Sequence, residues 1–123
     1  MIVQRLHMTE TAESDIWRLV GCHDERGVRQ TELEPDLEAL AEDLSRVLRA
    51  WRLEAPSDLQ AAVADVSRRS SRLGLNRLCR VARTVATLVG SGDRPALAAN
   101  IARLDRLGRA TLTDIWRLQD MPG

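Results

Sequence analysis

An arginine-rich stretch carries the clearest chemistry in this chain of 123 residues. From Arg68 to Arg83 the sequence has six arginines and no Asp or Glu. A guanidinium group presents several N–H donors in a planar fork, which suits carboxylate and phosphate oxygens. Such a stretch can bind an anionic partner, or it can pair with acidic residues elsewhere in the same chain. Both interpretations remain open from the sequence alone.

The acidic residues that could pair with these arginines lie in the first half of the chain. Residues 1–60 contain 7 Arg and 13 Asp or Glu, a net charge of −6. Residues 61–123 contain 11 Arg and 5 Asp, a net charge of +6, so the whole chain is neutral. Proteins that bind nucleic acid usually have an overall basic balance, and this composition therefore disfavours a nucleic-acid partner.

Other side chains with catalytic or metal-binding chemistry do not form a recognisable site. The consecutive residues 22–25 (Cys, His, Asp, Glu) offer four ligand types, but adjacent side chains rarely converge on one ion, so we expect no metal site. The sequence has no glycine-rich phosphate loop and no plausible Ser–His–Asp set. Cys79 recurs with apolar residues at helical spacing, which predicts a buried thiol. We therefore expect a non-catalytic protein without a cofactor.

Helices predicted from the apolar pattern must position these residues. Residues 21–33 lack helical periodicity and contain Gly21 and Gly27, so we expect a loop there, with a short extended piece over 28–30. Elsewhere, apolar residues three and four apart predict helices. Their expected ranges are about 10–20, 35–55, 57–73, 76–89 and 93–120.

Local signals mark several of the helix ends. Pro35 suits the first turn of its helix. Ser57 and Gln60 have the spacing of a capping box. Gly74 is expected to end the third helix in a left-handed conformation, and Asp93 is expected to cap the last helix.

The helix order and the composition together predict the fold. Hydrophobic residues make up 44% of the chain and aromatic residues only 2%, so the core must consist mainly of Leu, Val, Ile and Ala. Five helices with short loops predict an all-α, antiparallel four-helix bundle with a short extra N-terminal helix. We expect residues 1–9 to be disordered and residues 10–123 to form one domain, whose core bundle covers about 35–120.

The same sequence predicts a cytoplasmic protein. No stretch approaches the ~20 consecutive apolar residues of a membrane-spanning helix. The first seven residues are too short and too polar for a secretory signal. No membrane partner is expected.

A five-residue repeat occurs near both ends of the chain. The sequence Asp-Ile-Trp-Arg-Leu covers residues 15–19 and again 114–118. Apolar residues at helical spacing usually belong to the core, so we expect both turns to pack against the bundle with Ile and Leu facing inward. The alternative is a self-association surface that contains Trp17 and Trp116, which keeps a homodimer open.

The segment from residue 70 to residue 79 resembles part of the histidine phosphotransfer (Hpt) family. Hpt domains are four-helix bundles with a short extra N-terminal helix. Their third helix carries a pattern close to H-x-L-K-G-S-S-x-x-L-G, and the next helix often contains L-x-x-L-C. Here Ser70-Ser71-Arg72-Leu73-Gly74 and then Arg77-Leu78-Cys79 are similar to the ends of these patterns. Gly90-Ser91-Gly92-Asp93 resembles the usual A-G-D turn of the family, and the similarity covers about residues 35–120 by helix order.

The chain departs from the family pattern where phosphate would be carried. Aligned on Leu73-Gly74, the family's histidine falls on Ala64 and its glycine on Arg68. Phosphotransfer needs an imidazole nitrogen that attacks an aspartyl phosphate, and alanine cannot supply it. The only histidines, His7 and His23, both lie outside the expected bundle helices. The resemblance therefore implies an Hpt-like bundle that does not carry phosphate.

We expect one face of the third helix to serve as a docking surface. Its four residues, by helical spacing, are Ala64, Arg68, Ser71 and Arg72. The resemblance implies a receiver domain or a histidine kinase as partner, and the acidic pocket of a receiver suits arginines. We expect a non-catalytic signalling domain that binds such a partner. The alternatives are a solvated helix face on a self-associating or structural protein outside phosphorelay, and a nucleic-acid-binding helical module.

Overall fold

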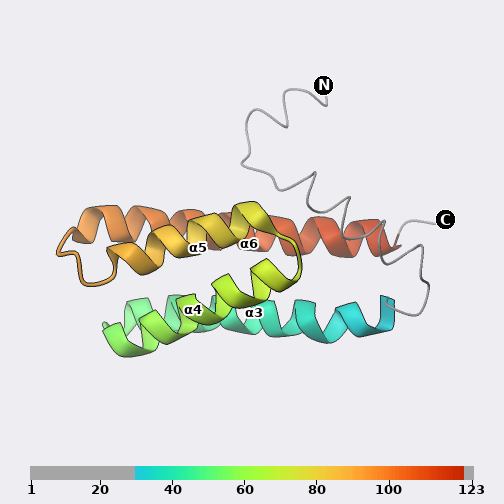
Figure 1. Ribbon diagram of the computed structural model, residues 1–123, viewed down its shortest axis with the longest axis horizontal. Coiled ribbons are helices and arrows are strands. Elements are labelled where there is room, and N and C mark those ends of the chain that lie inside the picture. The colour runs from blue at the N-terminus through green and yellow to red at the C-terminus, as the bar shows by residue number, and fades with distance from the viewer. Residues whose placement is uncertain (1–29, 121–123) are drawn as a thin grey trace, which may run out of the picture.

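The structure is a computed structural model that describes residues 30–120. Four α-helices and no strands occupy this range: α3 (Gln30–Arg52), α4 (Pro56–Arg72), α5 (Asn76–Leu88) and α6 (Arg94–Asp120). Successive helices run antiparallel, with α3 and α4 on one side and α5 and α6 on the other (Figure 1). The described part of the chain is thus all-helical, as predicted. The helix expected over 10–20 and the disorder expected over 1–9 lie outside the described residues.

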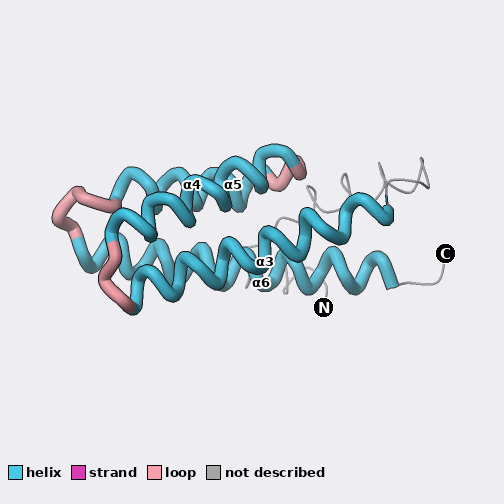
Figure 2. Tube along the Cα trace, turned by 90° about the horizontal axis from the view of Figure 1, so that it is seen from below, coloured by secondary structure: helices cyan, strands magenta, loops and turns pink. Residues whose placement is uncertain are grey.

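The helices pack in a closed ring. Contacts join α3 to α4, α4 to α5, α5 to α6, and α6 back to α3. The α3–α4 and α5–α6 turns lie at one end of the bundle, and the α4–α5 turn lies toward the other (Figure 2). Because α3 and α6 have 23 and 27 residues, they extend past the shorter pair at that second end. None of the described helices is long and apolar enough to cross a membrane.

Aliphatic side chains fill the centre of the bundle, as the composition predicts. Trp51 is only partly buried, and Trp116 is 36% exposed. Burial of one leucine or valine side chain contributes about 1.5–3 kcal/mol, so a row of such residues on each helix holds the four together. The largest side chains with less than 2% exposure are Leu33, Leu37, Leu40, Leu75, Leu78, Leu104, Leu107, Ile115, Val47, Val63 and Val66.

The start of α3 corrects two predictions. Residues 30–33 are helical rather than part of a loop, and Pro35 lies inside the helix rather than in its first turn. Leu33 is 1% exposed and continues the buried row of Leu37 and Leu40. Residues three and four apart share a helix face, so burial of Leu33 favours the extra turn. This burial offsets the backbone hydrogen bond that a proline inside a helix removes.

The start of α4 corrects a third prediction. The helix begins at Pro56, with Ala55 as the N-cap, and no side chain in the described part of the chain caps it. The capping box predicted for Ser57 and Gln60 is therefore wrong. Proline suits the first helical position because its fixed φ matches the helix and its missing N–H would have no partner there.

Two other predicted helix ends are confirmed. Gly74 has a φ of +77°, and the Leu75 N–H donates to the Ser70 carbonyl at 2.9 Å, which is the pattern of a glycine-terminated helix. At the start of α6, the Ala96 N–H donates to Asp93 Oδ1 at 3.1 Å. These two ends set the turns on either side of α5.

Candidate docking face and the charge network beneath it

The four residues predicted as a docking surface lie on the outward side of α4. Ala64, Arg68, Ser71 and Arg72 are all exposed. The opposite side of α4 is buried in the core through Leu59, Ala62, Val63, Val66 and Ser70. Helical spacing places the four exposed residues next to one another, and we call this surface the α4 face.

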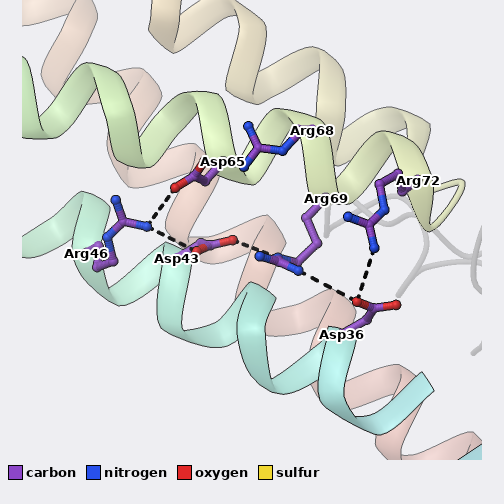
Figure 3. A network of polar contacts seen from close by, with 7 residues as sticks. All are labelled: Asp36, Asp43, Arg46, Asp65, Arg68, Arg69 and Arg72. Atoms are coloured by element: carbon purple, nitrogen blue, oxygen red, sulfur yellow. Dashed lines mark hydrogen bonds and ion pairs between the residues drawn. The ribbon is translucent and has the colours of Figure 1, made fainter. Parts of the chain in front are cut away.

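Acidic residues of α3 bind two of the three arginines of α4, Arg69 and Arg72 (Figure 3). Arg69 Nε donates to Asp43 Oδ2 at 2.9 Å, and Arg69 Nη1 lies 3.6 Å from Asp36 Oδ1. Arg72 Nη2 lies 3.5 Å from the same Asp36 oxygen. This part of the arginine stretch therefore pairs with the acidic first half of its own chain, which is one of the two interpretations left open by the sequence.

Asp43 is the most buried charged residue of this network. Its side chain is 7% exposed and lies between two guanidinium groups. Arg46 Nη1 donates to Asp43 Oδ1 at 3.2 Å, opposite the bond from Arg69. A carboxylate removed from water is strongly destabilising unless such partners surround it. Asp43 therefore fixes the positions of both arginines.

The Asp65 carboxylate connects this network to the α4 face. Arg46 donates to it at 2.8 Å, and Arg68 donates to its other oxygen. The hydrogen bond from Arg46, and after it the one from Arg68, lowers the pKa of Asp65 below its ordinary value. The same bond to Asp65 raises the pKa of Arg46. Arg68 is thus held beside a carboxylate that stays ionised at neutral pH.

The α4 face offers cations, and it has no imidazole at position 64. The Arg68 and Arg72 side chains are each 61% exposed although both are paired. A guanidinium has five N–H donors, and each of these pairs uses one nitrogen atom, so both groups can bind a further carboxylate. The alanine at position 64 has no atom that could attack an aspartyl phosphate.

A contact between α4 and α5 lies next to the α4 face. Cys79 is buried, as predicted, and its Sγ lies 3.7 Å from Ser67 Oγ and 3.5 Å from the Ser67 carbonyl oxygen. This contact orients α4 against α5. The thiol is enclosed between helices, so it supports packing rather than the surface chemistry of the α4 face.

Sequence reasoning missed the specific residues that hold the arginines. Asp43 and Asp65 are the central carboxylates of the network, and neither was singled out. For Asp43 the available signal was its place one residue before Leu44 in the apolar row of α3. A carboxylate at the edge of such a row needs a partner when the row packs.

Of the other predicted features, only those within residues 30–120 can be located in the structure. Among residues 30–120, no group of three or more His, Cys, Asp or Glu side chains could hold a metal ion. The Cys-His-Asp-Glu run at 22–25 lies outside the described residues, as does the first copy of the five-residue repeat. In the second copy, Ile115 is fully buried and Leu118 packs against the core, as predicted.

Comparisons with known proteins identified no relative of this chain. No family model matches the chain, and neither the curated proteins nor the solved structures with which it was compared gave a match. The resemblance to the Hpt family therefore depends on the quoted residues and on the order of the helices.

Proposed function

We propose that this chain is a non-catalytic, Hpt-like docking domain that acts in the cytoplasm. Its partner is a receiver domain or a histidine kinase, and the contact surface is the α4 face. The observation that supports this most is the exposed row of Ala64, Arg68, Ser71 and Arg72. This row occupies the part of the helix that carries the phosphorylated histidine in the family that the chain resembles.

The charge network makes the α4 face suitable for binding. Arg68 is held by Asp65, and Arg72 is held by Asp36. A side chain that is already ordered loses less conformational entropy when a partner binds. Exposed guanidinium groups also attract an acidic surface and orient it during association. The network therefore favours a partner rich in carboxylates.

The replacement of histidine by Ala64 makes the proposed role one of binding. A small side chain at this position lets a partner approach the helix backbone closely. It also prevents the chain from passing a phosphoryl group onward. Binding without transfer would sequester the partner or hold it near another protein.

Titration of the full chain with purified receiver domains and histidine kinases from the same organism tests this proposal. We expect at least one partner to bind with a Kd below ~100 μM. Ala64→Glu introduces a negative charge and bulk at the centre of the α4 face, so the complex should weaken by roughly ten-fold or more.

Ala102→Glu is the matched control, since Ala102 is an exposed alanine on α6, a helix that packs mainly against α3 and α5. It should leave the affinity unchanged. Absence of any complex at ~100 μM, or equal binding by Ala64→Glu and the parent chain, contradicts the proposal.

Self-association is the second candidate function. Trp116 is 36% exposed near the end of α6, where this long helix extends past α5. Exposed tryptophans are common anchors of protein interfaces. If the chain forms a dimer through this residue, sedimentation should show a dimer for the parent chain and a monomer for Trp116→Ala.

A further inference from the structure

A groove lies at the end of the bundle that carries the α3–α4 turn and the α5–α6 turn (Figure 2). Its volume is about 410 Å³, which is in the range of small-molecule sites, roughly 300–1,000 Å³. Residues of both turns line it, together with residues of all four helices. Most of this lining is apolar and includes Trp51, Leu59, Leu88, Val89 and Leu97. We call it the turn groove.

The α3–α4 turn has a strained backbone at one residue that lines the turn groove. Glu54 has a φ of +53°, whereas the other residues with a positive φ in the described range are all glycines. The Glu54 N–H donates to the Trp51 carbonyl at 3.2 Å, just as the Gly74 N–H donates to the carbonyl three residues before it. Glycine is the favourable residue at such a helix end, because a Cβ in this conformation approaches the backbone too closely. Strain of this kind clusters at functional sites, so it points to a use of the Glu54 carboxylate.

The ion pair that Glu54 forms does not offset this strain. Arg94 Nη2 donates to Glu54 Oε1 at 3.2 Å, and the two side chains are 63% and 71% exposed. An ion pair at this exposure adds little to stability, because water and salt screen it. The pair does hold a carboxylate and a guanidinium group next to each other beside an aromatic ring. The centroid of the Trp51 ring lies 4.7 Å from the Arg94 guanidinium carbon.

The polar groups that line the turn groove carry both signs of charge. Glu54 and Asp93 are carboxylates, and Arg94 is a cation. Asp93 Oδ1 also accepts the Ala96 N–H. A carboxylate accepts through two oxygens and a guanidinium has five N–H donors, so these contacts use only part of their capacity. A ligand with one positive and one negative group can therefore bind here while the Glu54–Arg94 pair stays intact.

We propose that the turn groove binds a small amphipathic zwitterion, of which an amino acid with a large apolar side chain is the simplest example. The apolar side chain packs against the Trp51 ring and the aliphatic lining. Arg94 donates to the ligand carboxylate, and the ligand ammonium donates to Glu54 or Asp93. Burial of apolar surface supplies most of the affinity, and the charged groups orient the ligand. The proposal does not depend on docking at the α4 face.

An NMR titration of the isotope-labelled full chain with L-tryptophan tests the site. We expect the amide signals of residues 51–56 and 89–94 to shift and to saturate with a Kd below ~1 mM. Three compounds with the same indole ring separate the contributions. Tryptamine lacks the carboxylate and indole-3-propionate lacks the ammonium, so each should bind about three-fold more weakly, as expected for one exposed charge contact. Indole lacks both groups and should bind about ten-fold more weakly.

Two substitutions separate the Glu54 carboxylate from the backbone strain. Glu54→Gln removes the charge and keeps the strained conformation, whereas Glu54→Gly also relieves the strain. Both should weaken L-tryptophan binding by about three-fold. Only Glu54→Gly should raise the melting temperature.

The Arg94 contact has its own variant and control. Arg94→Gln should weaken L-tryptophan binding by about three-fold and should leave tryptamine binding nearly unchanged, because tryptamine has no carboxylate. Arg52→Gln is the matched control, since Arg52 is an exposed arginine of α3 that does not line the turn groove. It should leave both affinities unchanged.

Several results would overturn the proposal. One is the absence of saturation at ~10 mM L-tryptophan. Indole that binds as tightly as L-tryptophan would show that the groove takes an apolar group alone. Tighter binding of tryptamine or of indole-3-propionate would show that only one charge is recognised. Equal losses in Arg94→Gln and Arg52→Gln would indicate a general effect of charge. A lower melting temperature for Glu54→Gly would show that this residue serves the fold.

Discussion

Replacing Arg69 with methionine should destabilise the bundle far more than replacing its neighbour Arg68. The Arg69 side chain is 22% exposed and binds Asp43, which is 7% exposed. The Arg68 side chain is 61% exposed and binds Asp65, which is 26% exposed. Methionine keeps an unbranched chain and a similar helix propensity, so each change mainly removes a guanidinium group.

The expected difference follows from the burial of Asp43. In Arg69→Met this carboxylate keeps one partner, Arg46 at 3.2 Å. Loss of one member of a buried ion pair costs about 3–5 kcal/mol, and loss of a single charged hydrogen bond costs about 1.5–3 kcal/mol. Because Arg46 remains, we expect the free energy of unfolding to fall by about 2–3 kcal/mol. Arg68→Met breaks an exposed pair and should cost about 0–1 kcal/mol.

Urea unfolding of both variants at neutral pH, followed by circular dichroism, measures this difference. Adding Asp43→Leu to Arg69→Met removes the carboxylate that lost its partner, and Arg46 still binds Asp65 at 2.8 Å. The double variant should therefore be more stable than Arg69→Met alone. Equal losses in Arg69→Met and Arg68→Met, or a double variant less stable than the single one, would refute the reasoning.

Three further changes give predictions of definite sign. In Gly108→Ala the new Cβ would lie 2.5 Å from Leu44 Cδ1, so we expect a net loss of about 1 kcal/mol after the gain in helix propensity. The same change in a Leu44→Ala background should raise the melting temperature, and a drop there would contradict the steric explanation. Ser70→Ala should increase the free energy of unfolding by roughly 1 kcal/mol in urea, because the buried Ser70 hydroxyl has no hydrogen-bond partner among residues 30–120. Folding lowers the pKa of Asp65. Its ion pairs therefore contribute their full stability at pH values above the ordinary aspartate pKa of about 4, and this contribution is lost as the pH falls through the lower pKa of the folded chain. The stability advantage of the parent chain over Asp65→Asn should therefore shrink as the pH falls below about 4, and a constant difference would contradict this assignment.

Local signals were enough to predict most of the described fold. Gly74 and Asp93 end and begin helices through their own backbone and side-chain preferences, and both were identified. The first turn of α3 was missed because charged residues interrupt the apolar pattern around Leu33 and because Pro35 is typical of a helix start. Burial of Leu33 depends on how α3 packs in the bundle, which local spacing does not contain.

The charge network includes contacts that could not be predicted from the sequence alone. Helical spacing alone identified the exposed side of α4, since it fixes which residues share a face. It placed Arg68 on that side and left Arg69 off it, but it could not show that Arg69 binds a buried carboxylate. Asp43 is 26 residues from Arg69 along the chain, and only the packing of α3 against α4 brings the two together. That the α4 face binds a partner stays a prediction.

An NMR titration of the isotope-labelled full chain with a receiver domain from the same organism tests the docking function most directly. We expect the amide signals of residues 64–72 to shift and to saturate with a Kd below ~100 μM. The signals of the exposed side of α6 should stay in place. No shift at ~1 mM receiver, or shifts confined to helices other than α4, would contradict docking through the α4 face.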